Sequence, residues 1–195
     1  LVSQFRKDYP NVKFRFKQEK YQSLVDAVMS GEIDLAMISP FPEEHPYVEG
    51  EKVLTEELFA IVPPNHPIAS QKSIRLEQLK GEQFVIFSEG YSLRKIVLDA
   101  CKKAGFKPKI SFEGEETDTI RGLVTVGMGV SLLPEMAVTN YGRTNYQPVQ
   151  VRVSEPKVTR TIGIIRRKDE KLPQVAYVFM KFLLQFFESM ERRQL

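Results

Sequence analysis

Hydrophobic and polar positions along the chain follow two periods, and the places where the period changes mark the predicted elements. Residues 12–16 alternate between apolar and basic side chains, which predicts a half-buried strand. Residues 21–30 repeat their apolar side chains every three to four positions and precede Gly31, which predicts a helix with a left-handed stop. The nearly continuous apolar run 33–38 is typical of a strand covered on both faces.

The rest of the chain continues this alternation of strands and helices. The pattern predicts strands over 58–62, 84–87, 106–112, 130–133, 149–153 and 161–165, a short helix near 76–80, and longer helices over 93–104, from Thr117 and from Val175. Pro108 favours an edge position for the strand that contains it. Alternating strands and helices predict an α/β fold with largely parallel strands, in which ligands bind at the C-terminal ends of strands, near helix starts.

Two glycines, Gly127 and Gly129, stand one residue apart before the apolar run that ends at Pro134. A dinucleotide-binding loop has a strand before its glycines, a helix after them and a third small residue. Here the predicted order is helix, glycines, strand, and the third position holds Leu132. We therefore interpret Gly127 as a helix stop and Gly129 as the point where the chain reverses.

Composition narrows the class of protein only slightly. The 195 residues are 42% hydrophobic and 27% charged, with a net charge of +3, which suits one globular domain or two small lobes and does not favour nucleic acid or membrane as a partner. The single cysteine, Cys101, excludes an internal disulfide and fits a reducing compartment. The sequence begins at Leu1 without an initiator Met, so we expect it to be a fragment.

Several segments, taken in order, carry a family resemblance. They are FRKDYP at 5–10, the stretch 24–37, IVPPNHPIA at 61–69, LEQLKG at 76–81, the pair Gly105-Phe106 and LVTVGMGVSLLP at 123–134. Together they span nearly the whole chain and resemble the effector-binding domain of LysR-type transcriptional regulators. The Gly-x-Gly-x-x-Leu-Leu-Pro stretch with the upstream His-Pro-Ile-Ala is the most specific combination.

The resemblance implies an α/β fold of the periplasmic-binding-protein-like type II, with two lobes joined by two crossover strands. The expected lobes are 1–63 with 160–195, and 64–159, and the expected crossing strands lie near 59–62 and 161–165. The family usually has a further strand and a Ser- or Thr-bearing loop before the position of Leu1, preceded by a DNA-binding winged helix. We expect this chain alone not to bind DNA, and it is open whether its site is incomplete or its first lobe is completed by another segment.

The resemblance also places an effector site in the interlobe cleft. The matching positions are Ser39, Pro40 and Phe41 after one strand, Ser88, Glu89, Gly90, Tyr91 and Ser92 at a strand-to-helix turn, and Gly114, Glu115 and Thr117 in a loop. Free N–H groups at a helix start favour a carboxylate or similar anion, and the two serine hydroxyls add donors. Glu89 favours an amino-acid-like ligand that also carries a cation. The alternatives are that Ser92 only caps its own helix and that Glu89 faces water.

Other candidate chemistry has structural explanations. Cys101 lies on the apolar face of its helix, which favours a buried thiol over one activated by the neighbouring lysines. His45 and His66 are isolated, so we expect no metal site, and we expect no cofactor and no catalytic constellation. Arg94 can reach a ligand carboxylate or face solvent, and we favour solvent.

The sequence thus predicts a non-enzymatic, cytoplasmic sensor of a small-molecule effector. Such family domains form homodimers or tetramers, with the helix 21–30 and its neighbouring strand of one subunit against the helix 93–104 of the other. DNA is reached only through the N-terminal domain, and no membrane partner is expected. The alternatives are a solute-binding protein of a transporter with the same fold and an enzyme on a similar two-lobed scaffold.

Overall fold

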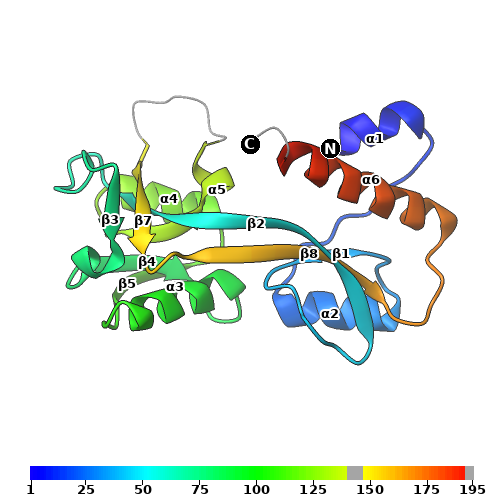
Figure 1. Ribbon diagram of the computed structural model, residues 1–195, viewed down its shortest axis with the longest axis horizontal. Helices are drawn as coiled ribbons and strands as arrows, with labels where there is room; N and C mark the ends of the chain where they lie inside the picture. Colours follow the sequence, from blue (N-terminus) through cyan, green and yellow to red (C-terminus); the bar gives the residue numbers. More distant parts are fainter. Residues whose placement is uncertain (140–146, 192–195) are drawn as a thin grey trace. The chain divides into compact units, whose positions relative to one another are not determined.

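The computed structural model describes residues 1–139 and 147–191, which form two compact units. Unit 1 comprises Leu1–Thr55 and Thr161–Leu195, and unit 2 comprises Glu56–Arg160. Two strands carry the chain between the units: β2 (Val48–Val62) leads from unit 1 to unit 2, and β8 (Thr159–Arg167) leads back (Figure 1). No described helix combines the length and apolar character that a membrane span needs.

In unit 1, a small sheet packs with three helices. The helices are α1 (Val2–Asp8), α2 (Tyr21–Ser30) and α6 (Gln174–Glu191), and β1 (Ala36–Ile38) pairs antiparallel with β8, which neighbours β2. The predicted helix 21–30 and its stop are confirmed, because Gly31 adopts φ +76°. The predicted strand 33–38 is shorter than expected and only one of its faces is buried, since Met37 is 42% exposed.

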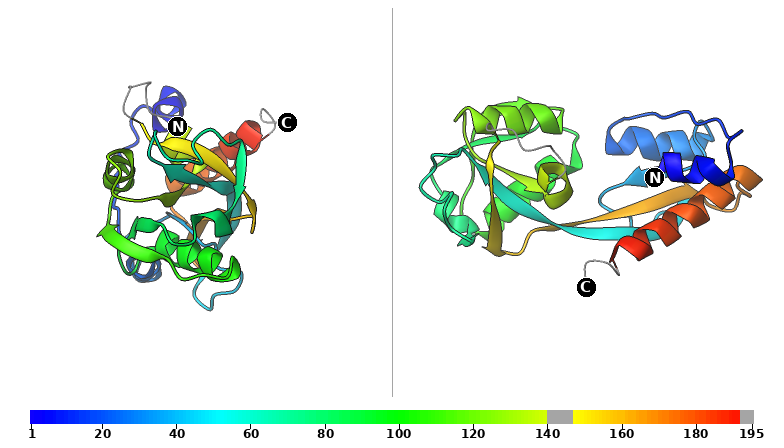
Figure 2. Two further views of the ribbon diagram at one scale, coloured as in Figure 1. Left: turned by 90° about the vertical axis from the view of Figure 1, so that its left-hand side faces the viewer. Right: turned by 90° about the horizontal axis from the view of Figure 1, so that it is seen from above.

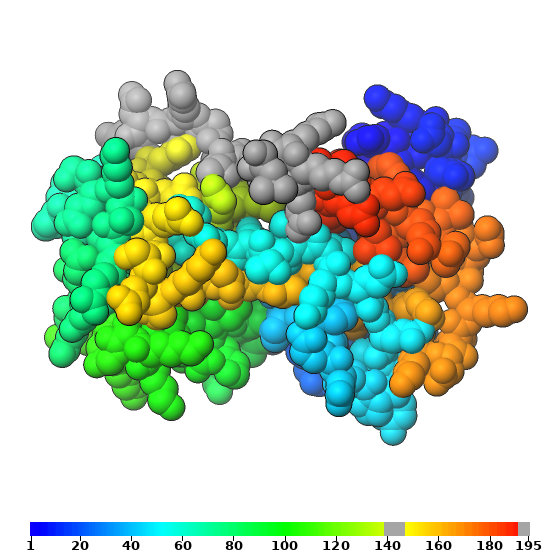
Figure 3. All heavy atoms as spheres, viewed as in Figure 1, coloured from blue at the N-terminus to red at the C-terminus, as the bar shows by residue number. Residues whose placement is uncertain are grey.

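Aromatic rings hold α1 against α6. The ring of Phe5, which is fully buried, lies 4.9 Å from Phe179 and 5.3 Å from Phe182 in edge-on contacts. The two helices lie side by side in Figure 2, and their atoms adjoin, blue against red, on the face shown in Figure 3. The phenylalanine stripe of the C-terminal helix is therefore core packing, as its helical spacing predicts. The spacing of Glu188 and Arg192 predicts an i,i+4 ion pair, but Arg192 lies outside the described residues.

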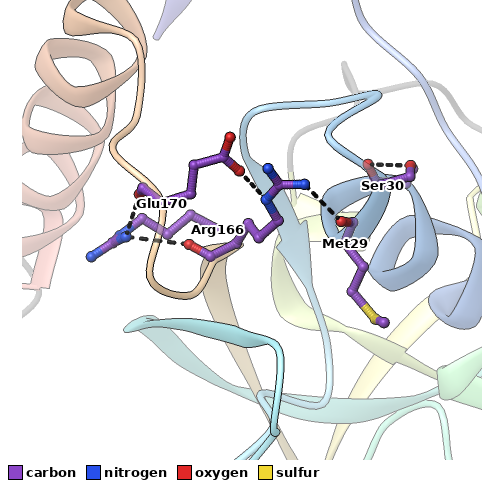
Figure 4. A network of polar contacts seen from close by, with 6 residues as sticks. Met29, Ser30, Arg166 and Glu170 are labelled. Carbon is purple, nitrogen blue, oxygen red and sulfur yellow. Dashed lines mark hydrogen bonds and ion pairs between the residues drawn. The ribbon is translucent and has the colours of Figure 1, made fainter.

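An arginine-rich network fastens the end of β8 to the end of α2 (Figure 4). Nη1 of Arg167 donates to the carbonyl of Met29 at 3.2 Å, and its Nε contacts Glu170. The neighbouring Arg166 lies 2.5 Å from Glu49 and donates to the carbonyl of Glu170 at 3.3 Å. A cation at the last carbonyls of a helix complements the helix dipole, so this network stabilises the C-terminus of α2.

The predicted strand 12–16 is wrong. Within the described residues this segment pairs with no strand, and the ring of Phe16 is 73% exposed. Alternation of apolar and basic residues predicts which face would be buried, whereas a strand exists only when a neighbouring backbone accepts and donates its hydrogen bonds. Phe14 still packs on Phe179, with ring centroids 4.9 Å apart.

In unit 2, two sheets and several helices surround the main hydrophobic core. The strands are β3 (Ser73–Arg75), β4 (Gln83–Phe87), β5 (Lys109–Gly114), β6 (Ser131–Pro134) and β7 (Val149–Glu155), and the helices are η1 (Leu76–Leu79), α3 (Ser92–Lys103), α4 (Thr117–Thr125) and α5 (Glu135–Thr139). Most of the helix and strand predictions are confirmed here, within a few residues at each end.

The direction of the strands differs from the prediction of a largely parallel sheet. β4 pairs with β5 and β3 with β7 in parallel, but β2 pairs antiparallel with both β6 and β7, and β1 pairs antiparallel with β8. An alternation of strands and helices does not reveal how the chain returns to a sheet. The long strand β2 receives neighbours that run the other way.

The glycine pair Gly127 and Gly129 ends α4 and starts the return to the sheet. The N–H of Gly127 (φ +85°) donates to Val124 and that of Met128 to Leu123, the two hydrogen bonds of a Schellman motif. A Cβ on Gly129 would lie 2.5 Å from the carbonyl oxygen of Gln83, with which Val130 forms a hydrogen bond at 2.8 Å. The predicted helix stop is confirmed, and Gly129 lets the chain approach β4.

Candidate functional site

Two loops of the predicted site meet at one edge of the β4–β5 sheet, the edge formed by the C-terminal ends of the two strands. The strands are parallel and their last residues pair, Phe87 with Gly114. The N–H of Ser88 also donates to the carbonyl of Gly114 at 2.8 Å. The turn 88–92 and the loop 114–117 therefore lie together at the C-terminal edge of the sheet, where α/β folds place their ligands.

The turn before α3 leaves its hydroxyls unused by the helix. The N-cap is Tyr91, the helix begins at Ser92, and no side chain caps it. The alternative in which Ser92 caps its own helix is therefore wrong, because this residue already has helical geometry. Ser88, Tyr91 and Ser92 are half-buried, Glu89 is exposed, and Gly90 is exposed with φ +90°, a conformation that favours glycine.

The second loop leads into α4 in the same way. Its N-cap is Glu116, no side chain caps the helix, and Thr117 is the half-buried first residue, as predicted. Gly114 is buried, and a Cβ there would lie 3.2 Å from the side chain of Ile120, so the strand end packs closely on the helix. Glu115 is exposed. The first turns of two helices thus begin beside one sheet edge, and their dipoles favour negative charge there.

Arg94 is fixed at this edge, contrary to the expectation that it faces solvent. Its side chain is only 20% exposed, and Nη1 lies 2.9 Å from the carbonyl oxygen of Phe87 and 2.8 Å from Oε1 of Glu113. Glu113 was not among the predicted site residues. A charged residue directly before the strand-ending Gly114 was the available signal, because it stands at the same edge as the predicted site.

Ser39, Pro40 and Phe41 follow β1 and belong to unit 1, whereas the two loops belong to unit 2. The hydroxyl of Ser39 is buried and has no hydrogen-bond partner among the described residues, and Pro40 is exposed. The ring of Phe41 packs on the unit 1 core and lies where a Cβ on Gly163 would stand. Packing inside unit 1 therefore accounts for much of the surface of Phe41.

Cys101 is fully buried, and burial raises the pKa of its thiol to about 12, so the interpretation as a buried thiol is confirmed. Nδ1 of His45 accepts from the N–H groups of Tyr47 and Val48 at 3.2 Å. Nδ1 of His66 accepts from the N–H of Ile68 at 3.3 Å. Both histidines thus support local turns, and the described residues form no cluster of three or more metal-ligating side chains.

Solved structures with similar folds include an effector-binding domain and a regulatory domain, each with a bound small molecule. The effector binding domain of QuiR in complex with shikimate superposes with a TM-score of 0.85 at 26% identity, covering 96% of this chain and 88% of that one. The regulatory domain of CcmR from Synechocystis PCC6803 in complex with 2-PG gives 0.88 at 20% identity, covering 97% and 90%. These likenesses confirm the periplasmic-binding-protein-like type II fold.

Related sequences agree with the structures. The transcriptional dual regulator GltC of Bacillus subtilis (strain 168) is 42% identical over 194 residues, which cover 100% of this chain and 64% of that protein. The HTH-type transcriptional regulator YybE of the same strain is 37% identical, covering 97% and 63%. The chain thus spans less than two thirds of the length of these relatives. The family model described as the LysR substrate binding domain matches residues 1–188, and the chain therefore belongs to the LysR family of transcriptional regulators.

Proposed function

We propose that this domain senses a small carboxylate or amino-acid-like anion at the edge where the turn 88–92 meets the loop 114–117. The observation that carries the proposal is the pairing of Phe87 with Gly114, because it brings two strand ends and two helix starts together. The shikimate bound by QuiR is also a carboxylate, which supports the same ligand class. Residues Ser39, Pro40 and Phe41 stay predictions that rest on the family resemblance.

The charges at this edge favour a ligand of mixed sign. Backbone N–H groups and the hydroxyls of Ser88 and Ser92 supply donors for a carboxylate. The exposed carboxylates of Glu89 and Glu115 stand beside them and repel a simple anion. A ligand with both a carboxylate and an amine satisfies both sets of groups, which is why amino-acid-like effectors lead the proposal.

In the full-length protein, effector binding would control DNA binding by an N-terminal winged helix-turn-helix in the cytoplasm. LysR regulators bind small-molecule effectors and DNA. The proposed assembly is a dimer that places α2 of one copy against α3 of the other. This arrangement is the one that the family resemblance implies. Sedimentation of a double variant with reversed charges in α2 and α3 tests it, and a variant that stays dimeric contradicts it.

Thermal unfolding against amino acids, carboxylates and aromatic acids tests the ligand proposal. A ligand at about 100 times its Kd adds roughly 2.7 kcal/mol to the free energy of unfolding. For a chain of this size the midpoint rises on the order of 5–10 °C. The same panel is run on the full-length protein with operator DNA, where the compound that stabilises the domain should also change DNA affinity.

A matched pair of variants locates the site. S88A/S92A removes both hydroxyls of the turn and should weaken binding of the stabilising compound by about tenfold, the worth of a lost hydrogen bond or two. S70A removes an exposed serine elsewhere in unit 2 and should bind like the unaltered chain. Equal stabilisation of both variants would show that the ligand binds away from this edge.

A further inference from the structure

One nitrogen of the Arg94 guanidinium anchors the whole group. Nη1 reaches both the carbonyl oxygen of Phe87, at 2.9 Å, and Oε1 of Glu113, at 2.8 Å. These acceptors stand at the ends of the two parallel strands, so the guanidinium lies at the edge that the two loops share. The side chain is 20% exposed, and two acceptors from different strands fix its position.

The rest of the guanidinium has donors to spare. An arginine carries five N–H donors, of which Nη1 holds two. Within the described part of the chain, Nε and Nη2 of Arg94 donate to no protein group, and neither is sealed from solvent. Nε–H and one Nη2–H run parallel, which is the arrangement that binds both oxygens of a carboxylate.

We infer that Arg94 binds the carboxylate of the effector through Nε and Nη2, an inference that rests on the proposed function and names its specificity residue. Phe87 and Glu113 hold the group in place before the ligand arrives. Binding therefore loses little side-chain entropy, which a free arginine would lose on being ordered. A lysine at this position would keep the charge without the two parallel donors.

The charge of Glu113 makes Arg94 selective among anions. A carboxylate 2.8 Å from Nη1 cancels much of the long-range attraction that Arg94 exerts on anions. An anion is then held only where its two oxygens meet Nε and Nη2 directly. Removing that charge with E113Q should tighten binding of simple carboxylates, whereas a purely structural role of the Arg94–Glu113 pair predicts weaker binding.

Acetate is the probe that tests this contact without knowledge of the natural effector. Sodium acetate is titrated into ¹⁵N-labelled domain at constant ionic strength with chloride as the control, and the arginine Nε–Hε signals are followed by NMR. The Arg94 signal, assigned with R94K, should shift and saturate, and E113Q should lower the acetate concentration at half-saturation. The Arg121 signal should not move, because Asp118 lies 3.4 Å from its Nη2. An Arg94 signal that moves no more than that of Arg121 overturns the inference.

The effector panel separates this inference from the proposed function. R94Q and R94K should weaken any stabilising acid about 10- to 100-fold, as expected when charge-assisted hydrogen bonds are lost. The methyl ester of that acid should bind the unaltered domain and R94Q equally. An acid that binds R94Q as tightly as the unaltered domain refutes the role of Arg94 and leaves the proposed function standing. Saturable acetate binding at Arg94 with no stabilising acid in the panel would confirm the carboxylate contact and overturn the proposal that the domain senses one of those acids.

Discussion

Substitution of three glycines within eight residues of unit 2 by alanine should change stability in three different ways. Gly122 lies inside α4 with open space around it, so G122A should raise stability by roughly 0.5–1 kcal/mol. Gly127 also has open space but adopts φ +85°, so G127A should lower stability by about 1–2 kcal/mol through the backbone alone. Gly129 combines φ +149° with the carbonyl of Gln83 at 2.5 Å from an added Cβ.

The loss of stability expected for G129A is the sum of a backbone term and a contact term. A backbone held in a sparsely populated region costs about 1–3 kcal/mol. Moving Gln83 away also weakens its hydrogen bond with Val130, worth about 1 kcal/mol. The sum of about 2–4 kcal/mol corresponds to a midpoint lower by on the order of 10 °C, at about 2–4 °C per kcal/mol for this size.

Urea and thermal unfolding, followed by far-UV circular dichroism, measure all three variants under one condition. The expected order of stability is G122A above the unaltered chain, then G127A, then G129A. If G127A and G129A lose the same free energy, the close approach of Gly129 to β4 contributes nothing and the reasoning is wrong. If G122A is also destabilising, the higher helix propensity of alanine does not decide stability at this position.

Three further predictions concern charge, thiol reactivity and packing. Hydrogen bonds from Lys157 and then Arg152 lower the pKa of Glu57. The ionised carboxylate therefore stabilises the fold above about pH 4.3, and this contribution is lost as the pH falls through the lowered pKa. In urea unfolding, E57Q should be less stable than the unaltered chain at pH 7 and equally stable at low pH. Cys101, with its pKa raised to about 12, should react with a thiol reagent at pH 8 only at the rate of unfolding, and fast labelling would contradict its burial. G163A should destabilise by about 1–3 kcal/mol because the new methyl meets the ring of Phe41, and chemical denaturation that leaves its midpoint unchanged would refute that contact.

Features that depend on neighbouring residues in the sequence were predicted well. The stops at Gly31 and Gly127 and the apolar stripe that buries Cys101 were visible because each depends on a few neighbouring residues. The strand predicted over 12–16 failed for the opposite reason. Its pattern was that of a strand, but pairing needs a second backbone, and periodicity carries no information about one.

At the candidate site, too, the local turns were predicted and the contacts between distant segments were not. The sequence marked 88–92 and 114–117 separately, as turns between strands and helices, and the family resemblance named them as ligand positions. It did not show that Phe87 and Gly114 pair, nor that the first turn of α3 turns Arg94 back onto both strand ends.

The sequence by itself thus determined most of the helices with their stops, the α/β class and, through its resemblance, the family, whereas α1 was not predicted. Only the tertiary structure decided strand direction and the partners of Arg94. Helix formation is governed by hydrogen bonds between residues three or four positions apart, which a sequence displays directly. Sheet pairing and ion pairs join residues such as Arg94 and Glu113, whose contact exists only after β4 and β5 lie side by side.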